Sequence, residues 1–160
     1  MTESDSERVL AIYQQGMNDG QATFESSAPS WQEWDESHLR GCRIVAETEG
    51  VVVGWGALSP VSDRCVYGGV AEVSVYVDKG ARGMGIGRHI LSQLVECSES
   101  QGIWTLTAGL FQENTAGLKL HLNVGFRVVG RREKVGQHHG VWRDTLLLER
   151  RSSVVGVDSV

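Results

Sequence analysis

Apolar residues recur at helical spacing in four stretches of the chain. The first stretch begins with the capping-box pattern Ser4–Glu7 and reaches about Asn18, and a second, short helix is predicted to open with the capping box Ser30–Glu33. A third helix is predicted to follow a glycine-rich turn and to end near Gly102, and a fourth to span Asn114–Val124. Two helices therefore precede every predicted strand.

Stretches rich in valine, isoleucine, leucine and aromatic residues indicate the strands. The first two stretches are joined at Glu49-Gly50, which predicts a hairpin. The order is helix, helix, three strands, helix, strand, helix, two strands, and it predicts an α/β fold with one mixed sheet and helices on both faces. The predicted strands are Arg43–Glu49, Val51–Leu58, Ala71–Val77, Ile103–Leu110, Gly125–Val129 and Val141–Leu148.

The chain is expected to form one domain. Its 160 residues, 41% of them hydrophobic, are enough for one buried core, and no repeat, linker or low-complexity segment divides them. All predicted helices and strands fall within residues 1–151, which make up this domain. Residues 152–160 are predicted to be a flexible C-terminal tail.

The charge and hydropathy of the chain narrow the choice of partners. A formal net charge of −5 argues against nucleic acid or an anionic membrane surface as the main partner, although one basic strip can still hold phosphates. No apolar stretch reaches the roughly 18 residues of a membrane helix, and the N-terminal residues are acidic rather than signal-like. We therefore predict no nucleic-acid partner, no membrane partner and a cytoplasmic location. The basic strip consists of Arg82, Arg88, Arg131, Arg132 and Lys134.

The cysteines and histidines predict neither a disulfide framework nor a metal site. Cys42, Cys65 and Cys97 are odd in number and form no Cys-x-x-Cys pair, which is typical of a reducing compartment. His138 and His139 are adjacent, so in a strand they would point to opposite faces, and no third ligand stands at a suitable spacing.

A glycine-rich run, Arg82–Arg88, lies between a predicted strand and the start of a predicted helix. Its glycines let backbone N–H groups converge, and the helix N-terminus adds unpaired donors, so the run predicts a cradle for an anion such as a pyrophosphate. A P-loop would need a Gly-Lys-Ser/Thr sequence that is missing, and a dinucleotide fingerprint would need glycine where Arg88 or Ile90 stands. The alternative is an ordinary glycine-rich turn.

The remaining pattern is Arg-x-x-Gly-x-Gly, formed by Arg82, Gly85 and Gly87, and it resembles the acetyl-CoA loop of the GNAT-type N-acyltransferases. Further blocks resemble the phosphinothricin and methionine sulfoximine acetyltransferase branch of that family. They cover residues 18–25, 71–88, 114–130 and 135–150, and include Ala22-Thr23-Phe24-Glu25 and Glu72-Val73-Ser74-Val75-Tyr76-Val77. The resemblance implies the GNAT fold, acetyl-CoA as acetyl donor and a homodimer. Members of this family usually begin with a strand, which this chain lacks before its first predicted helix.

The resemblance also implies how acetyl-CoA binds. The backbone of the strand before the loop would pair with the pantetheine amides, and the loop would hold the pyrophosphate. Asn114 would bind near the pantetheine, but asparagine is also an ordinary helix N-cap, and both readings stay open. The implied residues are Val75, Tyr76, Val77, Arg82, Gly83, Met84, Gly85, Ile86, Gly87, Arg88 and Asn114.

Acetyl transfer to an amine requires a base, because an alkyl ammonium group titrates near ~10 in water. The resemblance implies that Glu72 is this base. It also implies that His121 assists, either as a proton donor to the leaving thiol or as a second base. The alternatives are an exposed strand carboxylate for Glu72 and a packed or solvated helix residue for His121.

The acceptor is expected to be a small amino-acid-like amine such as phosphinothricin or methionine sulfoximine. A polyamine, a peptide N-terminus or another amine stays open as acceptor, as does a non-catalytic acyl-CoA-binding sensor. An anionic acceptor needs cationic partners, and Arg64, Arg131, Arg132 and Lys134 are candidates, with plain solvation as the alternative for each. By resemblance, the acceptor pocket is lined by Phe24, Glu25, Cys65, Val66, Tyr67 and Glu72.

Overall fold

The predicted hairpin is the first part of the sheet. In the computed structural model, which describes residues 1–158, β1 (Ile44–Thr48) and β2 (Val51–Pro60) pair antiparallel. Glu49 and Gly50 connect them with φ values of 51° and 78°, the left-handed conformation that suits a two-residue hairpin turn.

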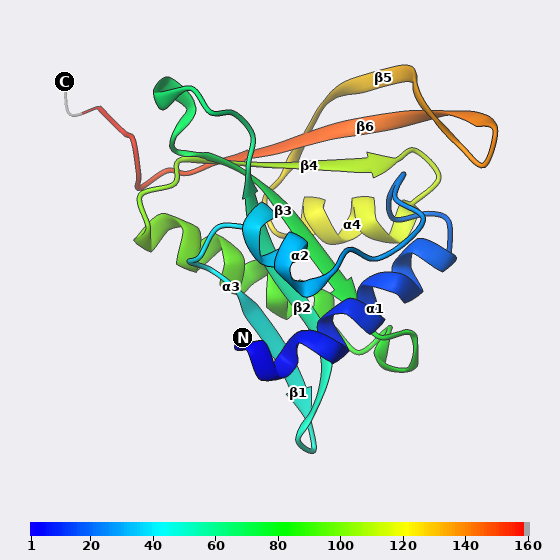
Figure 1. Ribbon diagram of the computed structural model, residues 1–160. Coiled ribbons are helices and arrows are strands. Elements are labelled where there is room, and N and C mark those ends of the chain that lie inside the picture. The colour runs from blue at the N-terminus through cyan, green and yellow to red at the C-terminus, as the bar shows by residue number, and fades with distance from the viewer. Residues whose placement is uncertain (159–160) are drawn as a thin grey trace.

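Four further strands complete a six-stranded mixed sheet (Figure 1). They are β3 (Val70–Val77), β4 (Thr105–Phe111), β5 (Arg127–His138) and β6 (Val141–Arg151). The strand order is β1-β2-β3-β4-β6-β5, and only the central pair, β3 and β4, runs parallel. The predicted order of helices and strands and the mixed sheet are confirmed.

The helices lie on both faces of the sheet and bury separate apolar clusters. They are α1 (Ser6–Asn18), α2 (Trp31–Ser37), α3 (Ile86–Ser100) and α4 (Thr115–Asn123). On one face Trp55 and Ala57 of β2 join a cluster with residues of α1 and α2, whereas Leu58 belongs to the cluster that contains α3. Alternate side chains of β2 thus point to opposite faces of the sheet, as expected for a strand that is buried on both sides.

Two glycines of β2 let α3 approach the sheet closely. A Cβ atom added at Gly56 would lie 2.5 Å from Ile90 Cγ2, and one at Gly54 would lie 2.9 Å from Ile90 Cδ1. Ile90, Leu91 and Leu94 of α3 are fully buried against this surface. The start of α3, which follows the glycine-rich run, is therefore packed closely on β2.

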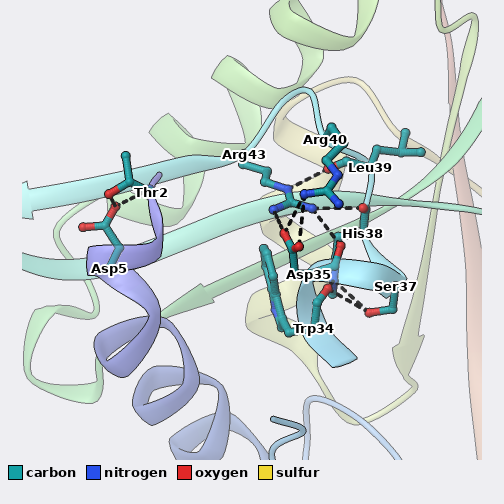
Figure 2. Close-up of polar contacts among 9 residues, drawn as sticks. All are labelled: Thr2, Asp5, Trp34, Asp35, Ser37, His38, Leu39, Arg40 and Arg43. Atoms are coloured by element: carbon teal, nitrogen blue, oxygen red, sulfur yellow. Dashed lines mark hydrogen bonds and ion pairs between the residues drawn. The ribbon is translucent and has the colours of Figure 1, made fainter. Parts of the chain in front are cut away.

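Two local predictions need correction. The sequence places a capping box at Ser4–Glu7, but the chain begins with a 3₁₀ turn, η1 (Glu3–Asp5), in which the Asp5 carboxylate accepts a 2.7 Å hydrogen bond from Thr2 N–H (Figure 2). The other correction is the length of β5, which continues to His138 instead of ending near Val129. Most side chains of that extension are exposed and polar, so the hydrophobic pattern carried no strand signal there.

Arg43 fixes the end of α2 to the segment that leads into β1 (Figure 2). Its guanidinium donates to the backbone carbonyls of Leu39, Asp35 and His38 at 2.7, 2.9 and 3.1 Å, and it forms an ion pair with the Asp35 carboxylate. The side chain also covers the ring of Trp34 at 5.1 Å. One partly buried arginine thereby satisfies carbonyl groups at the end of α2 and just beyond it.

The structure contradicts the prediction drawn from the cysteine count. Cys42, before β1, and Cys97, on α3, form a disulfide with their Cα atoms 5.6 Å apart, and Cys65 is free. The partners are 55 residues apart in the sequence, so no short spacing signals the pair. An odd count is compatible with one disulfide and one free thiol and does not by itself indicate a reducing compartment. The cytoplasmic location stays a prediction.

Removal of this disulfide is expected to destabilise the domain. A bond that closes a loop of this length restricts the unfolded chain and contributes about 2–4 kcal/mol. For a domain of this size, such a loss lowers Tm by roughly 4–16 °C. Thermal unfolding of Cys42→Ser, and of the unmodified protein with and without dithiothreitol, measures the effect. Cys65→Ser is the matched control and should keep its Tm, whereas an unchanged Tm for Cys42→Ser would contradict the pairing.

The segment after β6 contacts Arg151. The guanidinium of this residue donates to the carbonyls of Ser152, Val155 and Gly156 at 2.9, 2.8 and 2.6 Å. The flexible tail over residues 152–160 stays a prediction, and its residues 159–160 lie outside the described residues. Among residues 1–158, no helix has the length and apolar character needed to cross a bilayer.

Candidate active site

A fork between the two parallel strands creates the main cavity. β3 and β4 pair only at Val70, Ala71 and Glu72, opposite residues 105–107, and then diverge, as Figure 1 shows. Beyond Glu72, β3 continues to Val77 with β2 as its only partner among the described strands. A cavity of about 540 Å³ opens in this fork. Its polar lining residues are Tyr13, Thr23, Glu72, Ser74, Tyr76, Asn114, His121, Arg132 and Thr145.

Glu72 lies at the point where the fork opens. It is the last residue of β3 that pairs with β4, and its neighbours Ala71 and Val73 are buried in the core on the opposite face. The alternation of a strand therefore directs Glu72 into the cavity. The side chain is exposed to the open cavity, and its partial burial by the cavity walls raises the pKa of its carboxyl above the usual value for glutamate. A carboxyl with a raised pKa is well suited to accept a proton near neutral pH.

His121 lines the same cavity from α4 and is 6% exposed. Its Nδ1 lies 2.7 Å from the carbonyl oxygen of Gly117, and because a carbonyl can only accept, Nδ1 carries the proton. Burial lowers the pKa of the imidazole, against an opposing contribution from this hydrogen bond. The neutral ring leaves Nε2 as an acceptor, which favours a proton-accepting role over a proton-donating one.

Two tyrosines form the wall beside Glu72. Tyr13 of α1 and Tyr76 of β3 have ring centroids 4.8 Å apart, and Tyr76 stacks on the buried Trp55. Burial raises the pKa of both phenols, and the charges of Glu25 and Glu72 add to the rise. Both hydroxyls therefore stay protonated and are available as donors.

The glycine-rich run forms an exposed turn into α3. Gly83 and Gly85 have φ values of 80° and 78°, and a Cβ added at either would meet no atom within 4 Å. Space is thus open above the turn, and the first N–H groups of the 15-residue helix α3 have no partner inside the helix. An anion fits this geometry. Arg82 is paired with Asp19 at 2.6 Å, whereas Arg88 is exposed and has no ion pair within residues 1–158.

Asn114 caps α4 and also lies in the lining of the cavity. Its Oδ1 accepts a 2.9 Å hydrogen bond from Gly117 N–H, which caps α4. The residue also lines the cavity in the fork. The N-cap role is confirmed, and the contact with pantetheine stays a prediction.

Arg143 attaches the loop after α1 to the β5–β6 hairpin. Its guanidinium donates to Gly20 O at 3.3 Å, to Gln21 Oε1 at 2.9 Å and to Glu113 Oε2 at 3.0 Å. It also lies 4.0 Å from the ring centroid of Phe111, which packs edge to face against Phe24 of the attached loop. These contacts place Phe24 in the cavity wall.

The remaining predicted acceptor residues do not line this cavity. Cys65, Val66 and Tyr67 form an exposed 3₁₀ turn, η2 (Cys65–Tyr67), before β3. Glu25 follows Phe24 in the attached loop, and its charge acts on both tyrosines. Their direct contact with an acceptor stays a prediction.

The structure distinguishes among the arginines that are candidates to bind an anionic acceptor. Arg132 lines the cavity, whereas Arg131 is paired with Glu133 at 2.8 Å. Arg64 lies over the Tyr67 ring at 5.7 Å, outside the cavity lining. Three residues of the lining have no signal in the sequence that marks them as site residues, namely Tyr13, Thr23 and Thr145. Tyr13 fits the apolar spacing of its helix, and a lone threonine on a loop or strand carries no local signal.

Comparison with known proteins identifies a family and several relatives of this chain. The family model described as the acetyltransferase (GNAT) family matches residues 7–126. A phosphinothricin N-acetyltransferase of Alcaligenes faecalis is 32% identical over 160 residues, which cover 92% of this chain and 78% of that protein. An L-methionine sulfoximine/L-methionine sulfone acetyltransferase of Pseudomonas aeruginosa is 27% identical over 152 residues, with 91% and 88% covered.

Solved structures show the same fold. A ribosomal-protein-alanine N-acetyltransferase from Brucella melitensis superimposes with a TM-score of 0.89 and 33% identity, over 95% of this chain and 97% of that one. A phosphinothricin acetyltransferase from Sinorhizobium meliloti in complex with AcCoA gives a TM-score of 0.89 and 27% identity, over 99% and 89%.

Proposed function

This chain belongs to the acetyltransferase (GNAT) family, and on that basis we propose that it acetylates the amine of a small amino-acid-like acceptor of the phosphinothricin or methionine sulfoximine type. As a family member it is an acetyl-CoA-dependent N-acetyltransferase. The observation that carries the proposal is the fork between β3 and β4, where a carboxyl of raised pKa, Glu72, faces a cavity of about 540 Å³. A cavity of this volume suits a small acceptor beside the acetyl group.

The fork between β3 and β4 suits the pantetheine part of acetyl-CoA, and the glycine-rich turn suits its pyrophosphate. The edge of β3 beyond Glu72 leaves backbone groups available for the pantetheine amides, with Val75 and Val77 as the proposed partners. The open turn at Gly83–Arg88 and the N-terminus of α3 would hold the pyrophosphate. Asn114, which lines the cavity between them, would contact the pantetheine.

The proposed chemistry is direct transfer, for which acetyl-CoA supplies an electrophilic carbonyl carbon and a thiolate leaving group. Glu72 accepts a proton from the acceptor ammonium, directly or through a water molecule, and so frees the nitrogen lone pair. The new C–N bond forms as the C–S bond breaks, and the nitrogen loses its second proton, which His121 Nε2, an acceptor, would take. The sulfur leaves as the CoA thiolate, and the O–H groups of Tyr13 and Tyr76, which line the cavity, would stabilise it by hydrogen bonds.

One other acceptor class is favoured by a specific finding. The Brucella melitensis structure is named a ribosomal-protein-alanine N-acetyltransferase, and this name supports a peptide N-terminus as the second candidate. We also propose a homodimer and a cytoplasmic location.

A panel of acceptors tests the proposal. Thiol release from acetyl-CoA is measured with methionine sulfoximine, methionine sulfone, phosphinothricin, spermidine and a peptide that begins with alanine. We expect kcat/KM to be highest for one of the three amino acids. A preference for the peptide or for spermidine would overturn the acceptor class, and acetyl-CoA binding without turnover of any acceptor would indicate a sensor instead of an enzyme.

A further inference from the structure

The charged groups that line the cavity are few and of opposite sign. Glu72 contributes a carboxylate, and Arg132 is the one arginine or lysine among the lining residues described. His121 is held neutral by burial, and both tyrosines stay protonated. One anionic and one cationic group therefore face the same space.

The position of Arg132 follows from the register of the last two strands. Arg132 pairs with Thr145 of β6, and both side chains line the cavity. Arg131, its neighbour, pairs with Leu146, and its guanidinium lies near the carboxylates of Glu133 and Asp144 at 2.8 and 3.6 Å. Successive residues of a strand point to opposite faces, so only one of the two arginines is directed into the cavity.

Arg132 is also left without a partner. Within residues 1–158 no carboxylate lies within ion-pair distance of its guanidinium, although Arg131 and Arg143 both have one. Arg132 is the last residue of β5 in regular pairing before the irregular register that follows it, and its side chain is exposed. Its charge is therefore available to a ligand that enters the cavity.

We propose that Arg132 is a specificity-determining residue that binds the carboxylate of the acceptor. This inference rests on the proposed function, because it concerns the acceptor of that same site. An amino acid presents an ammonium group and a carboxylate a few bonds apart, and Glu72 and Arg132 supply the complementary pair. The planar guanidinium binds a carboxylate through two parallel hydrogen bonds, which fixes the orientation of the α-amine. A polyamine would instead place a second cation near Arg132, which is unfavourable.

The test compares an acceptor with and without its carboxylate. Values of kcat/KM are measured for methionine sulfoximine and for its carboxamide, with the original enzyme, Arg132→Gln and Arg132→Lys. The original enzyme is expected to prefer the acid by about tenfold or more, the value of one charge-assisted hydrogen bond. Arg132→Gln should lose that preference, with the acid slowed about 10–100-fold and the amide changed less than about threefold. Arg132→Lys should restore part of the preference for the acid. The KM for acetyl-CoA should stay constant in both variants.

Arg131→Gln is the matched control, since it removes a neighbouring arginine that faces away from the cavity, and it should retain the preference for the acid. If Arg132→Gln still prefers the acid while the original enzyme turns over amino acids, Arg132 does not bind the carboxylate and only this inference fails. If the original enzyme acetylates spermidine or the peptide but no amino acid, the proposed function fails and this inference fails with it.

Discussion

Glu72→Gln is expected to lower kcat by roughly 10²–10⁴-fold while the KM for acetyl-CoA stays nearly constant. The substitution keeps the size and hydrogen-bonding capacity of the side chain but removes its ability to accept a proton. The acceptor amine would then stay protonated and non-nucleophilic at neutral pH. Steady-state kinetics with both substrates varied measures the change. Thermal unfolding of the variant should match that of the original protein, because Glu72 makes no ion pair within residues 1–158.

The pH dependence gives a second readout of the same substitution. Burial raises the pKa of Glu72, and only the ionised carboxylate can accept a proton. The value of kcat/KM should therefore fall as the pH falls through a pKa above the usual range for glutamate, and Glu72→Gln should lack that limb. Glu47→Gln, at an exposed position of β1 that does not line the cavity, is the matched control and should behave like the original enzyme. A near-normal rate for Glu72→Gln would remove this residue from the mechanism.

Gly85→Val is expected to raise the KM for acetyl-CoA by about tenfold or more and to change the KM for the acceptor far less. Gly85 has a φ of 78°, a conformation that costs an L-residue roughly 1–2 kcal/mol and is worse for a β-branched side chain. The strain does not come from crowding, because a Cβ there would meet no protein atom within 4 Å. Relaxation of the turn would turn its N–H groups away from the pyrophosphate, and the added side chain would occupy the open space above them.

A second glycine provides the control for this strain. Gly50, in the β1–β2 turn, has the same φ of 78° and the same open surroundings, but belongs to neither the glycine-rich run nor the cavity lining. Gly50→Val should therefore lower the thermal stability without raising the KM for acetyl-CoA. An unchanged affinity of Gly85→Val for acetyl-CoA would contradict the role given to the turn.

The features that the sequence predicts well are those encoded by neighbouring residues. Helical spacing of apolar side chains locates α1, and Glu49-Gly50 locates the hairpin, because each signal lies within one short segment. The resemblance implies Glu72 and His121, and the structure places both in one cavity although they stand on different elements. Their chemical roles stay predictions.

The features that the sequence does not predict depend on distant residues or on mixed patterns. The disulfide joins Cys42 to Cys97 across 55 residues, and no spacing rule reaches that far. The polar extension of β5 lacks apolar alternation, because its side chains face the solvent and the cavity instead of a core. The basic strip contains several equivalent-looking residues, and only the strand register shows that Arg132 lines the cavity while Arg131 does not.

The identity of the reaction product tests the central claim most directly. Methionine sulfoximine is incubated with the protein and acetyl-CoA that carries ¹³C in the acetyl carbonyl, and the mixture is followed by NMR. The account predicts that the label appears as an amide on the α-nitrogen, in equal amount to the CoA released. Hydrolysis of acetyl-CoA without amide formation, or label retained on the protein, would contradict direct transfer to an amino-acid acceptor.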